Sequence, residues 1–132
     1  MSLTLVDTSV WIEVFRRDRS LDLEAVVPFD DVVTCLPVLQ EVLQGFDTER
    51  AYRAARAAML NLPVVESPVE LSLVEEAVAL YRSARRQGVT VRSSVDCLIA
   101  ACALRHDLEV LHRDRDFAGL ARVSSLRERQ PR

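Results

Sequence analysis

The sequence predicts one α/β domain built around a short, mainly parallel central sheet. The chain has 132 residues, 49% of them hydrophobic and 28% charged, which fits a single globular domain with its own core. Short apolar runs alternate along it with longer segments of helical period. Such alternation is typical of parallel strands joined by right-handed crossovers. We therefore expect one domain over residues 1–132, with a frayed tail from about residue 124.

The first quarter of the chain carries the signals of two strands with helical segments between them. An apolar run at residues 3–6 predicts the first strand. Thr8 and Ser9 are good N-cap residues for the helix that follows. A weak helix is expected over residues 21–27, before a second strand at residues 32–35.

The middle of the chain predicts three helices and one more strand. Apolar side chains recur at helical spacing over residues 37–45 and again over residues 48–62. A short third strand is expected at residues 64–65, since two valines follow a proline there. The longest helix is expected over residues 68–87, ended by Gly88.

The last third of the chain repeats the alternation. A helix is expected to begin at Ser93 and to bury an apolar stripe that includes Cys102. A fourth strand follows at residues 109–111, and a short helix at residues 116–122. No internal repeat or linker interrupts this order, which supports a single α/β domain.

The missing residue types exclude several classes of enzyme. All 17 basic side chains are arginine, so a Schiff base and a P-loop lysine are impossible. The three glycines, Gly45, Gly88 and Gly119, lie tens of residues apart. This spacing rules out a dinucleotide-binding glycine loop and the nucleophile elbow of α/β-hydrolases.

The cysteines favour a reducing compartment. Cys35, Cys97 and Cys102 form no C-x-x-C pair, and with only His106 and His112 beside them a structural zinc site is not expected. The sequence shows no signal peptide and no apolar stretch of the ~18 residues that span a bilayer. We expect a cytoplasmic protein with no membrane contact.

Acidic side chains gather where the predicted strands end. Asp7 directly follows the first strand, and Asp114 and Asp116 follow the fourth. Parallel strands end at the same edge of a sheet, where ligands of α/β proteins bind. Glu41 and Asp96 lie on predicted helices and are further candidates.

Carboxylates crowded at one edge repel each other unless a cation compensates them. With neither lysine nor a histidine cluster available, a hard divalent ion with oxygen ligands, Mg²⁺ or Mn²⁺, fits best. Such an ion could activate water and bind a phosphate oxygen.

Each acid also has a purely structural interpretation. Asp7 could cap the following helix, and Asp96, three residues after Ser93, completes a capping box. Glu41 lies away from the apolar stripe of its helix, as a solvated residue would. The acids after the last predicted strand lie in an alternating charge run that is typical of a surface turn.

The order of four segments carries more information than any single residue. The chain reads DTSVWIEVF, then PVLQEVLQG, then SSVDCLIAACAL and finally VLHRDRDF. In this order it resembles the PIN-domain ribonucleases over essentially its whole length, most closely the small VapC-type toxins of bacterial toxin–antitoxin pairs. The first and third segments are the most specific.

The resemblance implies a PIN-like α/β/α sandwich and a Mg²⁺-dependent endoribonuclease in which Mn²⁺ substitutes. The family's catalytic, metal-binding acids fall on Asp7, Glu41, Asp96 and Asp114, and Asp116 matches an additional acid. It also implies a cognate VapB-type antitoxin, a homodimer, hetero-oligomers with the antitoxin, and structured RNA such as tRNA as the substrate.

The sequence departs from the family pattern at one position. Many relatives have threonine or serine two residues before the fourth acid, where this chain has His112. By its place, His112 is expected to be a surface residue at the end of a strand rather than a general base. Alternatively, it could replace the missing hydroxyl as a hydrogen-bond donor.

The net charge is compatible with RNA binding. It is −3 for the chain and becomes +1 when the four family acids are set aside. Arginine suits phosphate and stacked bases, although any single one could be ordinary solvated surface. The candidates for substrate contact flank the proposed acids: Arg16, Arg17, Arg19, Arg92, Arg113 and Arg115.

Two other functions are alternatives to the nuclease. A dehalogenase-type phosphatase needs a second aspartate two residues after the first, where this chain has Ser9, and normally a lysine. A PIN-like module that binds RNA or protein with little or no cleavage is the second alternative. Stabilisation by Mn²⁺ would discriminate between this module and the nuclease.

Overall fold

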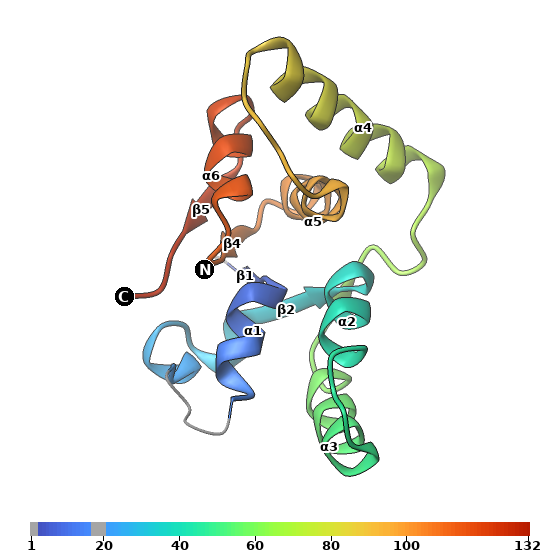
Figure 1. Ribbon diagram of the computed structural model, residues 1–132, viewed down its shortest axis with the longest axis vertical. Coiled ribbons are helices and arrows are strands. Elements are labelled where there is room, and N and C mark those ends of the chain that lie inside the picture. Colours follow the sequence, from blue (N-terminus) through green and yellow to red (C-terminus); the bar gives the residue numbers. More distant parts are fainter. Residues whose placement is uncertain (1–2, 17–20) are drawn as a thin grey trace.

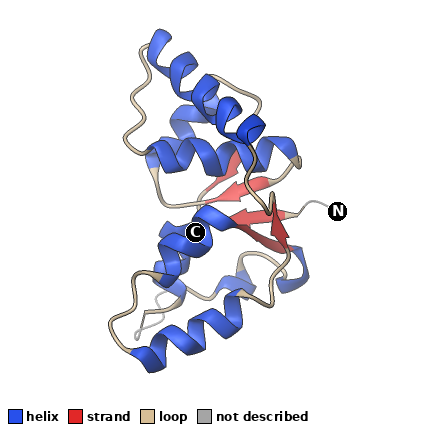
Figure 2. Cartoon of the chain, turned by 90° about the vertical axis from the view of Figure 1, so that its right-hand side faces the viewer, coloured by secondary structure: helices blue, strands red, loops and turns tan. Residues whose placement is uncertain are grey.

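The computed structural model describes residues 3–16 and 21–132, and in them five parallel strands form one sheet with helices on both sides (Figure 1 and Figure 2). The strands are β1 (Thr4–Val6), β2 (Val32–Cys35), β3 (Val64–Val65), β4 (Glu109–Leu111) and β5 (Arg127–Arg129). Their order is β3-β2-β1-β4-β5, and every neighbouring pair is parallel. The predicted α/β/α fold is confirmed.

Helices connect the strands and cover the sheet. They are α1 (Thr8–Val14), α2 (Leu36–Leu43), α3 (Glu49–Met59), α4 (Leu71–Arg86), α5 (Ser94–Arg105) and α6 (Arg115–Arg122). Helix α4 packs along α5, which also contacts α6, while α1 packs against α2 (Figure 1). Among the described residues, no helix has both the length and the apolar character that a membrane crossing requires.

The central strands are buried on both faces, as expected for a parallel sheet covered by helices. Every residue of β1 and β2 is buried. Leu5 of β1, Ile99 of α5 and Phe117 of α6 are among the largest fully buried side chains. This core holds the carboxyl ends of β1 and β4 side by side, since Val6 pairs with Leu111.

The prediction of a weak helix over residues 21–27 is wrong. Only a single 3₁₀ turn, η1 (Leu23–Ala25), forms there, and a second, η2 (Phe29–Asp31), precedes β2. The N-cap residue of η1, Asp22, makes no capping hydrogen bond, so a longer helix has no start signal. Leu21, Leu23 and Val27 of this segment are buried in the core without a helix.

The prediction that the tail is frayed from about residue 124 is also wrong. Residues of β5 pair in parallel with β4, from Glu109 opposite Arg127 to Leu111 opposite Arg129. Side chains add to the backbone pairing, since Arg129 donates to the Glu109 carboxylate at 2.6 Å and to the Val26 carbonyl at 3.2 Å. The tail therefore forms the fifth strand and one edge of the sheet.

Candidate metal centre

Adjacent strands bring the first two candidate acids together. Asp7 directly follows β1 and caps α1, and Asp114 follows β4 and caps α6. The two strand ends are joined by the backbone, because the Asp7 N–H donates to the Leu111 carbonyl at 2.9 Å. The expectation that parallel strands would place these acids at one edge of the sheet agrees with this geometry.

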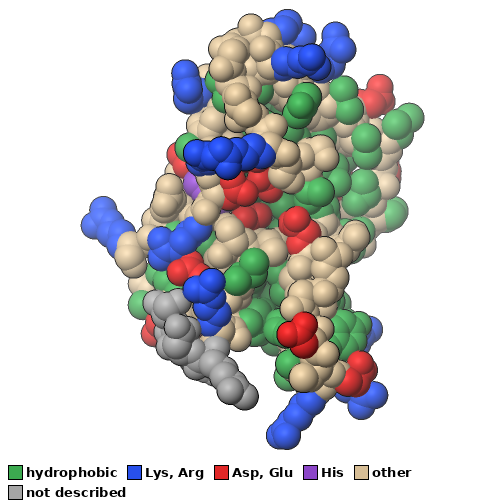
Figure 3. Space-filling view, in the orientation of Figure 1, with side chains coloured by type: hydrophobic (Ala, Val, Ile, Leu, Met, Phe, Trp, Pro, Cys, Tyr) green, Lys and Arg blue, Asp and Glu red, His purple; other side chains and the backbone are tan. Residues whose placement is uncertain are grey.

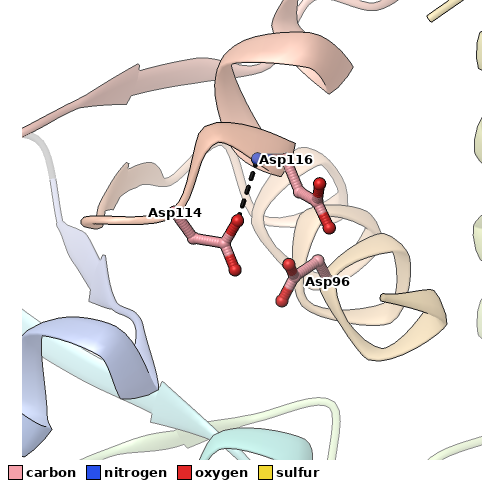
Figure 4. Close-up of side chains that lie close together, drawn as sticks. All are labelled: Asp96, Asp114 and Asp116. Carbon is pink, nitrogen blue, oxygen red and sulfur yellow. Dashed lines mark hydrogen bonds between the residues drawn. The ribbon is translucent and has the colours of Figure 1, made fainter. Parts of the chain in front are cut away.

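Three carboxylates form a tight group at this edge. Asp96, in the first turn of α5, faces Asp114 and Asp116 at the start of α6 (Figure 4). Each of the three offers an oxygen, and these oxygens all lie within 4.8 Å of one another. Asp96 and Asp116 are buried, and Asp114 is half-buried. A group of oxygen ligands with this spacing suits a divalent cation.

Backbone N–H groups hold Asp116 in place. Its Oδ2 accepts from the N–H of Arg92 at 3.0 Å and from that of Ser93 at 2.9 Å. Its own N–H donates to Asp114 Oδ1 at 2.9 Å. Asp116 therefore ties the start of α6 to the turn that begins α5, and so holds Asp114 and Asp96 near each other.

Asp7 is buried, with 3% of its surface exposed, and has one free oxygen. Its Oδ2 accepts from the Ser9 N–H at 3.0 Å and from the Ser9 hydroxyl at 2.5 Å. Within the described residues, Asp7 Oδ1 and Asp96 Oδ2 are buried atoms that make no hydrogen bond. Buried carboxylate oxygens without partners are costly and call for a compensating group.

The raised pKa values of Asp96 and Asp7 also indicate that the site requires a compensating cation. Burial is the main cause that raises the pKa of Asp96 to about 9, and the neighbouring carboxylates of Asp114 and Asp7 add to it. Burial also raises the pKa of Asp7, with a smaller contribution from the charge of Asp114. At neutral pH these acids cannot all ionise without a cation, and a divalent ion would allow it.

Glu41 is not part of the three-carboxylate group. It is half-buried on α2, and its Oε1 accepts from the Thr8 hydroxyl at 2.9 Å. Thr8 and Ser9 were expected to be N-cap residues of α1, but the N-cap is Asp7. The two hydroxyls instead orient acids of the site, a role that their position next to Asp7 in the sequence could have signalled.

His112 is not the surface residue that its sequence position predicts. The side chain is fully buried, and its ring contacts Phe117 of α6 and Glu128 of β5. Its Nδ1 accepts from the Asp114 N–H at 3.1 Å, and its Nε2 lies 2.8 Å from Glu128 Oε1. The ring thus contacts the backbone of a site residue and donates to no carboxylate of the site.

The candidate arginines differ in their surroundings. Arg16, Arg92 and Arg115 are exposed, whereas the Arg113 side chain is ion-paired with Glu13. Figure 3 shows acidic side chains near the middle of one face, with basic side chains above and beside them. The two remaining candidates, Arg17 and Arg19, lie outside the described residues.

The chain is similar to known proteins both in sequence and in structure. Residues 4–123 match the PIN domain family. The chain is 34% identical over 129 residues to ribonuclease VapC11 of Mycobacterium tuberculosis and, with the same figures, to a VapC ribonuclease of Mycobacterium bovis. Each match covers 94% of this chain and 96% of the relative.

Solved structures show the same fold. VapBC-5 of Mycobacterium tuberculosis, a toxin–antitoxin system, matches with a TM-score of 0.71 and 26% identity, covering 99% of this chain and 100% of that one. VapBC of Salmonella typhimurium, solved with DNA, matches with a TM-score of 0.78 and 17% identity, covering 98% of both chains.

Proposed function

This chain belongs to the PIN-domain family, and from that premise we propose that it is a metal-dependent endoribonuclease, the toxin of a type II toxin–antitoxin pair. It hydrolyses RNA phosphodiesters. One observation of the site carries the proposal: two buried carboxylate oxygens without a hydrogen bond in the described chain, on Asp7 and Asp96, belong to acids whose charges act on each other.

The cofactor that we propose is Mg²⁺, with Mn²⁺ able to substitute. The donor set fits, because carboxylate oxygens are the ligands that these ions prefer. Asp7 and Asp96 would hold the ion directly, Asp114 and Glu41 would bind it or its waters, and Asp116 would assist. When bound, the ion supplies an activated water and stabilises the charge that develops on the phosphate.

The protein side chains do the remaining work. Thr8 and Ser9 orient Glu41 and Asp7 through hydrogen bonds, so that the carboxylates need no rearrangement during reaction. A carboxylate at the rim of the site, Asp114 or Glu41, would accept the proton of the attacking water.

Arginines at the rim bind the RNA backbone. Exposed Arg16, Arg92 and Arg115 contact phosphates, and structured RNA such as tRNA is the substrate class that we propose. Arg113 is less available for this role because it is paired with Glu13.

A VapB-type antitoxin is the proposed partner, together with a homodimer and a toxin–antitoxin hetero-oligomer. Solved relatives are VapBC complexes, which supports this assignment. Three free cysteines and an RNA substrate both fit a cytoplasmic protein.

Cleavage by the purified chain, without antitoxin, tests the proposal. Total tRNA is incubated with Mg²⁺, with Mn²⁺ or with EDTA, using the wild type, Asp96→Asn and a control, Asp47→Asn, whose residue is exposed and outside the site. We expect metal-dependent cleavage by the wild type and the control only. Equal cleavage by Asp96→Asn would show that the site is misplaced. Wild-type protein that neither cuts RNA nor is stabilised by Mn²⁺ would favour the binding module.

A further inference from the structure

His112 is a buried polar side chain that the proposed reaction does not use. It follows β4, and its ring packs against Phe117 of α6 with centroids 5.2 Å apart. Both ring nitrogens are engaged, one by the backbone of Asp114 and the other by the side chain of Glu128. Because the ring is fully buried, it cannot exchange a proton with substrate or water at the site.

The two contacts define the tautomer of the ring. A backbone N–H can only donate, so His112 Nδ1, which accepts from Asp114, carries no proton. The proton of the neutral ring is then on Nε2, which donates to Glu128 Oε1 at 2.8 Å. The order of the hydrogen bonds is therefore from the Asp114 N–H to the ring and from the ring to the Glu128 carboxylate.

We propose that Glu128, acting through His112, is a positioning residue for the metal-binding carboxylate of Asp114. This inference rests on the proposed function. Asp114 is held at two points, since its N–H is bound by the ring and its Oδ1 accepts from the Asp116 N–H. These contacts restrain both its backbone and its side chain. Partners that orient a ligand in this way contribute to metal affinity.

The position of Glu128 on β5 supports a specific role. Side chains alternate along a strand, so Glu128 points to the opposite face from Arg127 and Arg129. The side chains of those arginines pair with Asp107 and Glu109, and the contact of Arg129 with His112 is made by the backbone alone, since the Arg129 carbonyl accepts from the His112 N–H at 3.1 Å. Glu128 also lies beyond residues 4–123, where the family match ends. A contact from this last strand is thus linked, through His112, to the backbone of Asp114.

Four variants of the full chain separate positioning from packing. Glu128→Ala removes the acceptor for the ring, and Glu128→Gln restores an acceptor oxygen. His112→Leu removes both ring contacts. Arg127→Ala is the matched control, because it removes a neighbouring β5 side chain that pairs with Asp107 instead. Mn²⁺ affinity is measured by EPR titration, beside unfolding by urea in EDTA and cleavage of tRNA.

We expect Glu128→Ala and His112→Leu to weaken Mn²⁺ binding about 10-fold or more, the effect of losing a partner that orients a ligand. Glu128→Gln and Arg127→Ala should bind Mn²⁺ as the wild type does. Unchanged affinity in Glu128→Ala, or an equal loss in Arg127→Ala, would overturn the inference and leave the proposed function intact. A wild-type chain that neither binds Mn²⁺ nor cuts RNA would overturn both.

The wild-type protein offers a test that does not depend on any variant folding. Nitrogen-15 spectra of the His112 ring in EDTA should show the Nε2–H tautomer, with Nδ1 unprotonated. A proton on Nδ1 would overturn the inference, because the ring could then no longer accept from Asp114.

Discussion

Replacing Asp96 by asparagine should make the metal-free protein more stable than the wild type, by a margin that grows as the pH rises, although the substitution destroys the site. Burial and the neighbouring acids raise the pKa of Asp96 from its ordinary value of 3.8 to about 9. Between these values the folded chain holds a proton that the unfolded chain has released. Folding therefore becomes less favourable as the pH increases through this window.

The size of the effect follows from proton linkage. One extra proton bound by the folded state lowers the free energy of unfolding by about 1.4 kcal/mol for each pH unit. From about pH 5 to about pH 8, Asp96 therefore costs the wild type at most about 4 kcal/mol. Asparagine has no proton to lose, so this contribution is absent from Asp96→Asn. Asp7, whose pKa is also raised, contributes a slope of the same sign to both proteins.

Urea unfolding in EDTA across this pH range measures the difference. The free energy of unfolding should fall more steeply with pH in the wild type than in Asp96→Asn. Asp47→Asn, an exposed substitution, should keep the wild-type slope. Added Mn²⁺ should stabilise the wild type and the control, but not Asp96→Asn, because the ion binds only an intact folded site. Parallel slopes in the wild type and Asp96→Asn would refute this account of the site.

Three further substitutions test separate parts of the proposal. Asp7→Asn should reduce RNA cleavage at least about 100-fold in single-turnover assays, because an amide is a poor metal ligand; wild-type rates would contradict this. Asp116→Ala should lower the free energy of unfolding in urea by about 1–3 kcal/mol, because the N–H groups of Arg92 and Ser93 lose their acceptor. Arg115→Ala should weaken RNA binding and reduce its salt dependence in titrations, whereas an unchanged salt dependence would remove Arg115 from the RNA interface.

Local signals were sufficient for most of the sheet. The sequence predicts the strand at residues 32–35 with the bounds that β2 has, because a run of valine and threonine, typical of a strand, lies between two aspartates and the proline of the next helix. Helix α4 begins at Leu71, three residues later than expected, and its N-cap residue is Glu70, which has an extended backbone. The place where Asp7 and Asp114 meet is also predictable, because parallel strands have their carboxyl ends at the same edge of a sheet and both acids follow such an end.

The parts that failed depend on contacts between distant residues. The sequence of β5 alternates arginine and glutamate and has no apolar signal for a strand. It pairs because β4 offers an open edge and Glu109 binds Arg129, which no local pattern reports. The prediction that His112 lies at the surface fails for the same reason. Its ring is buried and contacts Glu128 of β5, a strand that no local pattern predicts. The same contact brings Glu128 to the site.

The acids of the site divide their two oxygens between folding and function. Asp7 binds Ser9 through Oδ2, Asp114 binds the Asp116 N–H through Oδ1, and Glu41 binds Thr8 through Oε1. In each case one oxygen accepts a hydrogen bond that orients the side chain. Within the described chain the second oxygen of these acids accepts none, and for Asp7 that atom is buried. A carboxylate used only for folding would satisfy both oxygens or expose them, so of these three acids it is Asp7, with its buried and unpartnered Oδ1, that calls for a bound cation.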